Sequence, residues 1–126
     1  MLKSNALECP SPDYLAGLLG AGVASVELID GGRNSRTFNV NVEDGSKYVA
    51  KLYLDTTADG ESRVATEFST LKFLHSKGVG CVPRAVAADH DRQCAIYELI
   101  EGTKVESSRA TMADIDQMCH FLLRLN

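Results

Sequence analysis

The sequence predicts an α+β domain built on a five-stranded antiparallel sheet, with helices segregated around it. Apolar and polar residues alternate from Phe38 to Glu43, which is the period of half-buried strands. Asp44-Gly45 interrupts that alternation and is a strong hairpin signal. The predicted order of elements is helix, three strands, helix, two strands and helix, and this order indicates the antiparallel arrangement.

Length and composition limit the possible functions. The 126 residues suffice for one domain at most, and the net charge of −4 comes with basic residues scattered along the chain. We therefore expect neither nucleic acid nor a membrane as a partner. The sequence shows no secretory or transmembrane segment, so we expect a cytoplasmic protein. No two cysteines form a Cys-x-x-Cys pair, which favours reduced, mostly packed thiols over zinc or disulfides.

The first half of the chain contains a helix and three strands. Residues 1–10 are predicted to be a loose lead-in, and Ser11-Pro12-Asp13 predicts the start of a helix that ends near Leu19. The first strand is expected from Val23 to Ile29, ended by Asp30-Gly31-Gly32, and the second begins near Arg36. The second strand places Phe38, Val40 and Val42 on one face. The third, from Lys47 to Leu54, places Val49, Lys51 and Tyr53 together.

A second helix is predicted from Asp59 to Ser76, ending at Lys77-Gly78. Its apolar stripe consists of Val64, Phe68, Leu71, Leu74 and His75, and His75 is expected to be packed. Glu67 lies inside this stripe. Because an isolated buried charge is costly, Glu67 should be paired, and Lys72 or Arg63 could pair with it for purely structural reasons.

The remaining elements are two strands and a third helix. The strands are expected at Arg84 to Ala88 and at Cys94 to Ile100, on either side of a polar turn. Thr111 and Asp114 form a capping-box pattern at the start of the last helix. One face of that helix carries Ile115, Met118, Cys119, Leu122 and Leu125, and we expect this bare apolar face to drive self-association.

Three features together suggest a phosphate site, although a purely structural role is the better explanation of Gly31-Gly32 alone and of Lys51 alone. A glycine turn such as Gly31-Gly32 lets backbone N–H groups approach phosphate oxygens. Lys51 on a following strand can neutralise phosphate charge, and Glu67 on the next helix can hold that lysine in place. The combination predicts a nucleotide site of the protein-kinase type.

Five segments, in this order and spacing, resemble the N-terminal lobe of the aminoglycoside phosphotransferase/choline kinase-like superfamily, which has a protein-kinase-like fold. They are Gly31 to Val40, Tyr48 to Lys51, Glu67 to Leu74, Val82 to Val86, and Tyr97 to Gly102. The likeness covers nearly the whole chain. It rests on the order of several weak motifs.

The resemblance implies roles for individual residues. Gly31, Gly32, Arg33, Asn34 and Ser35 would form a flap over the phosphates of ATP, and Val40 and Val49 would line the roof of the adenine pocket. Lys51 would contact the α- and β-phosphates and be oriented by Glu67. Tyr97 would close the back of the pocket. The carbonyl of Glu98 and the N–H of Ile100 would bind adenine, and Gly102 would turn the chain toward a second lobe.

The resemblance also implies domain boundaries and an activity. Residues 1–102 would be the nucleotide-binding lobe, and residues 103–126 a connector and the first helix of a truncated second lobe. The parent enzyme would transfer the γ-phosphoryl group of ATP to a hydroxyl of a small polar acceptor. The family's His-x-Asp-x-x-x-x-Asn loop and its metal-binding Asp do not occur in the sequence. We therefore expect no catalytic or metal-binding residue in this chain, and Mg²⁺ only with the missing second lobe. The alternative is a stand-alone, non-catalytic module that binds nucleotide or another protein.

Overall fold

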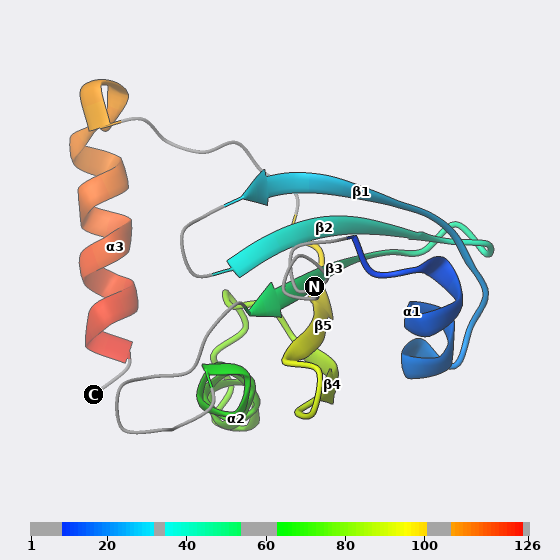
Figure 1. Cartoon of the computed structure of the whole chain (residues 1–126). Helices are drawn as coiled ribbons and strands as arrows, with labels where there is room; N and C mark the ends of the chain where they lie inside the picture. The colour runs from blue at the N-terminus through cyan, green and yellow to red at the C-terminus, as the bar shows by residue number, and fades with distance from the viewer. Residues whose placement is uncertain (1–8, 32–34, 54–62, 101–106, 125–126) are drawn as a thin grey trace.

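A computed structural model describes residues 9–31, 35–53, 63–100 and 107–124 (Figure 1). The elements in chain order are α1 (Pro12–Leu19), β1 (Val23–Gly31), β2 (Ser35–Val42), β3 (Lys47–Tyr53), α2 (Arg63–Ser76), β4 (Ala85–Asp89), β5 (Cys94–Glu98), the 3₁₀ turn η2 (Ser107–Arg109) and α3 (Met112–Arg124). This α+β arrangement confirms the predicted fold class. Of the helices in this part of the chain, none is long and apolar enough to cross a bilayer.

The described strands form one antiparallel sheet in the order β1-β2-β3-β5-β4. β1, β2 and β3 are joined consecutively, whereas β5 pairs with β3 and leaves β4 at the edge. β1 reaches Gly31, two residues beyond the predicted strand, because Asp30 and Gly31 still pair with Thr37 and Arg36. β5 ends at Glu98, so the predicted strand to Ile100 was two residues too long.

The hairpin between β2 and β3 has a three-residue loop. Val42 N donates to Ser46 O at 2.8 Å, Gly45 N donates to Val42 O at 2.9 Å, and Gly45 has a φ of +94°. Residues 43–45 therefore form the loop, with glycine in the left-handed region as such three-residue loops require. The resulting register pairs Val40 with Tyr48 and Asn39 with Val49. A two-residue Asp44-Gly45 loop would have paired Val40 with Val49 instead.

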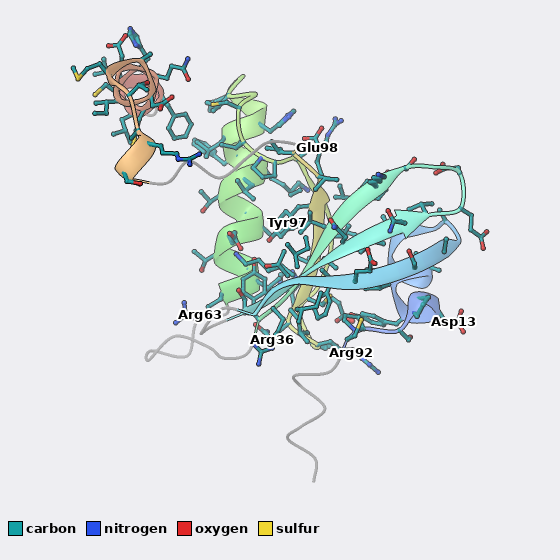
Figure 2. All side chains as sticks on the ribbon, turned by 90° about the horizontal axis from the view of Figure 1, so that it is seen from above. Asp13, Arg36, Arg63, Arg92, Tyr97 and Glu98 are labelled. Carbon is teal, nitrogen blue, oxygen red and sulfur yellow. The ribbon has the colours of Figure 1, made fainter. Side chains whose placement is uncertain are left out.

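The two faces of the sheet are covered differently, and Figure 2 shows the sheet between α1 and α2. On one side, here called the Leu15 face, Leu15 of α1 packs with Phe38, Val40, Ala50 and Ile96. On the opposite side, the Lys51 face, α2 packs over β5 and the end of β3 through Val64, Phe68 and Leu71, which contact the buried residues Tyr53, Ala95 and Tyr97. β5 is consequently buried on both faces, whereas β2 buries only the residues that face α1.

The helix ends follow the sequence signals. α1 begins after Ser11, whose hydroxyl accepts a hydrogen bond from Tyr14 N at 3.1 Å, and ends at Gly20 with a φ of +78°. α2 ends before Gly78, which has a φ of +85°. Its predicted start at Asp59 lies outside the described residues. The predicted packing of His75 was wrong: His75 lies in the last turn of the helix and is exposed.

α3 stands beside the sheet, at the left of Figure 1. Its first turn carries the predicted capping box, since Thr111 N donates to Asp114 Oδ2 at 2.9 Å and Asp114 N donates to Thr111 Oγ1 at 3.2 Å. The apolar side chains that remain exposed on α3 are Met112, Ile115, Met118, Leu122 and Leu123. Of the cysteines, only Cys94 is buried among the described residues, so the expectation of mostly packed thiols was wrong for Cys9, Cys81 and Cys119.

Candidate functional site

Lys51 and Glu67 form an ion pair between β3 and α2. Lys51 Nζ lies 3.1 Å from Glu67 Oε1 and 3.2 Å from Oε2, so the ammonium group donates to both carboxylate oxygens. The side chains of Lys51 and Glu67 are 28% and 38% exposed, so both remain partly accessible. The predicted pairing of Glu67 is therefore confirmed, and Lys51 is its partner.

Packing of α2 explains why the two charges meet. Val64, Phe68 and Leu71 contact the buried residues of β3 and β5, and Glu67 lies beside them on the helix surface, between the directions of Leu71 and Leu74. On β3, alternation places Lys51 on the same face as Tyr53, which belongs to that cluster. The carboxylate is thus directed at the sheet by the same stripe that docks the helix.

Two tyrosines extend the pair into a hydrogen-bonded chain. Tyr53 Oη donates to Glu67 Oε1, and the hydroxyl oxygens of Tyr53 and Tyr97 are 3.0 Å apart. A phenol has one hydrogen to donate. Since Tyr53 gives its hydrogen to Glu67, Tyr97 must donate to Tyr53. The hydrogen-bonded chain therefore runs from Tyr97 through Tyr53 to Glu67. Lys51 also donates to the Glu67 carboxylate.

The surroundings keep Tyr97, at the buried end of this hydrogen-bonded chain, protonated. Burial raises the pKa of Tyr97 well above its ordinary value, and the negative charge of Glu67 raises it further. The Tyr97 ring lies 6.0 Å from the Phe68 ring, in a tilted arrangement, and Figure 2 shows Tyr97 between β5 and α2. Lys51 Nζ also lies 5.2 Å from the centre of the Tyr53 ring, close enough for a cation–π contact.

The part of the Lys51 face that α2 leaves open is formed by Thr37, Asn39 and Val49. Thr37 pairs with Lys51, Asn39 pairs with Val49, and Val49 pairs with Tyr97 across the next strand. All three are half-buried.

The prediction that Val40 and Val49 line one pocket was wrong. Val40 is fully buried on the Leu15 face, beneath α1. The three-residue hairpin loop shifts the pairing by one residue relative to a two-residue loop, and a shift of one residue moves a side chain to the other face. Asn39 is the residue of β2 that pairs with Val49.

The predicted phosphate flap is described only at its two ends. Gly31 is the last residue of β1, and Ser35 is the first residue of β2. Gly32, Arg33 and Asn34 lie outside the described residues. Ser35 pairs with Tyr53, two residues from Lys51 on β3.

The predicted adenine-binding segment follows β5. Glu98 N donates to Arg84 O at 2.9 Å, and Arg84 N donates to the Glu98 carboxylate at 3.1 Å, so the end of β5 is tied to the segment before β4. Figure 2 shows Glu98 beyond Tyr97 at the end of β5. Ile100 is 52% exposed, and Gly102 lies outside the described residues. Adenine binding here stays a prediction.

The described residues do not fit a metal ion. In these segments no three His, Cys, Asp or Glu side chains come together in a way that could hold one. Glu67 is already engaged by Lys51 and Tyr53. Magnesium would need ligands from other residues or from the nucleotide itself, and we derive no step through it.

Reasoning from sequence missed Tyr53, Thr37 and Asn39. A signal for Tyr53 was present, because alternation put it on the face of Lys51, two residues along β3. Thr37 and Asn39 depend on the register of the hairpin, which the sequence pattern did not define.

Comparison with known proteins identifies the family. Residues 25–126 match the model of the phosphotransferase enzyme family, APH. Among solved structures, the crystal structure of a putative fructosamine-3-kinase from Thermobifida fusca YX-ER1 superposes with a TM-score of 0.51 at 21% sequence identity. The superposition covers 75% of this chain and 32% of the other, so this chain spans about a third of that kinase. No curated protein matches. The family match covers most of the chain, and the superposition agrees with it in fold: the chain belongs to the phosphotransferase enzyme family and folds as a kinase-like N-terminal lobe.

Proposed function

We propose that this chain is the ATP-binding portion of a phosphotransferase that acts on a hydroxyl of a small polar substrate. The observation that carries the proposal is the Lys51–Glu67 pair, set on the open side of the sheet in a member of this family. Kinases use such a strand lysine, held by a helix glutamate, to bind the phosphates of ATP.

The donor set suits a nucleotide polyphosphate. An ammonium has three N–H donors, and Glu67 takes two of them, which leaves one for a phosphate oxygen. β2 begins at Ser35, which pairs with Tyr53, two residues from Lys51, and in this proposal backbone N–H groups of the Gly31 to Ser35 segment would add neutral donors. Val49 supplies apolar surface for the base.

We further propose that residues 1–126 bind nucleotide without catalysing phosphoryl transfer. The sequence has no His-x-Asp-x-x-x-x-Asn segment to position an acceptor hydroxyl and hold magnesium. In this proposal the acceptor and the metal ligands belong to a second lobe, and the chain described here contributes the phosphate and base contacts.

Titration calorimetry with ADP tests the nucleotide site. Lys51→Ala should weaken binding by about tenfold or more, since a hydrogen bond between charged groups contributes about 1.5–3 kcal/mol and about 1.4 kcal/mol is tenfold. The matched control is Lys47→Ala, an exposed lysine on the same strand, which should leave affinity within about twofold. Equal affinities for the wild type and Lys51→Ala, or no binding by the wild type, would refute the proposal.

A further inference from the structure

We infer that Tyr53 is a positioning residue of the nucleotide site, whose hydroxyl, supported by Tyr97, fixes the Glu67 carboxylate that orients Lys51. The expected effect of Tyr53 on nucleotide affinity rests on the function proposed above. The hydrogen-bonded chain itself is a property of the protein without ligand, and it involves β3, α2 and β5 together.

A second hydrogen-bond donor to Glu67 keeps the carboxylate in place when Lys51 binds a ligand. When Lys51 alone holds the carboxylate, a phosphate that attracts the ammonium also releases Glu67. Tyr53 binds Oε1 independently of the ammonium, so Glu67 keeps its place while Lys51 contacts phosphate. A neutral donor suits this purpose because it does not compete with Lys51 for the phosphate charge.

Tyr97 holds Tyr53 in the donating orientation. Its hydroxyl lies 3.0 Å from the Tyr53 hydroxyl, and its side chain is only 4% exposed. With Tyr97 donating, the Tyr53 hydrogen is directed at Glu67, and each bond of such a chain polarises the next. The buried end of the chain is on β5, directly before the predicted adenine-binding segment, so the network links that strand to α2.

Removal of the Tyr53 hydroxyl is the first test. Tyr53→Phe keeps the ring packed and deletes one donor, and we expect ADP affinity to fall by about 3- to 10-fold. Tyr48→Phe is the matched control: the same change on the same strand, but on the Leu15 face, with an expected effect below about twofold. If both variants bind ADP like the wild type, Tyr53 has no positioning role.

A double-mutant cycle separates positioning from general packing. In a Glu67→Ala background, Tyr53→Phe should cause no further loss of ADP affinity, because the carboxylate that it positions is gone. An equal loss in both backgrounds would contradict the inference. If Tyr53→Phe does not fold, Tyr97→Phe serves instead, with a smaller loss that again disappears without Glu67.

A nucleotide-free readout distinguishes this inference from the proposed function. Carbon-detected NMR of the Glu67 carboxyl resonance should show a shift in Tyr53→Phe and no shift in Tyr48→Phe. A shift in a protein that does not bind ADP would refute the proposed function and keep the network. An unshifted resonance in a protein that binds ADP through Lys51 would refute the network and keep the proposed function.

Discussion

Glu67 shows how a single carboxylate is accommodated against an apolar cluster. Its pair with Lys51 is partly exposed, and such pairs stabilise a fold by only about 0.2–1 kcal/mol. A hydrogen bond to a charged group contributes about 1.5–3 kcal/mol. Lys51 and Tyr53 both donate to this carboxylate, so Glu67 is held by two side chains rather than by the ion pair alone.

Two tyrosines should make the fold less stable at high pH. Burial raises the pKa of both Tyr14 and Tyr97 above the ordinary value of 10.0, and the hydrogen bond to Asp89 raises that of Tyr14 further. Because the folded state holds these protons more tightly than the unfolded state, the free energy of unfolding should fall as pH rises above about 10. Denaturant unfolding at several pH values checks this. In Tyr97→Phe the free energy of unfolding should fall less steeply with pH. The same slope in the variant and the wild type would contradict it.

At the scale of elements, α1 docks on the sheet through few contacts. Leu15 is fully buried, and Tyr14 Oη donates to Asp89 Oδ2 at 2.7 Å. The guanidinium of Arg92 lies 5.2 Å from the centre of the Tyr14 ring. These contacts tie α1 to β4 and the turn after it, on the face opposite the ion pair.

Two glycines of this region should respond in opposite ways to the same substitution. Gly17 lies within α1, and a methyl group added there would meet no heavy atom within 4 Å, so Gly17→Ala should raise the free energy of unfolding by about 0.5–1 kcal/mol. Gly20 ends the helix with a φ of +78°, so Gly20→Ala should lower it by about 1–2 kcal/mol. Thermal or denaturant melts of the two variants give the comparison, and changes of the same sign would contradict this account of α1.

Sequence reasoning succeeded where a local pattern defines the outcome. The helix caps at Ser11 and Thr111 and the presence of each strand in the described residues follow from patterns a few residues long. It failed at Val40, because one extra loop residue between β2 and β3 changes which side chains share a face. It failed at His75, because the direction of a side chain around a helix does not show whether the last turn of that helix is covered.

At the scale of the whole molecule, unequal covering of the sheet creates the candidate site. α1 covers the Leu15 face, while α2 covers only the β5 side of the Lys51 face. Thr37, Asn39 and Val49 remain partly accessible beside Lys51. α3 lies apart from this arrangement and keeps its apolar side chains exposed. Self-association through α3 therefore stays a prediction.

The central claim is that nucleotide binds on the Lys51 face, and methyl NMR during an ADP titration tests it most directly. The methyl resonances of Val49 and Thr37 should shift in a saturable way, because these side chains border Lys51 on the open side. The resonances of Val40 and Val42, buried on the Leu15 face, should stay close to their starting positions. Shifts confined to Val40 and Val42, or no shift at any of the four residues, would contradict the account.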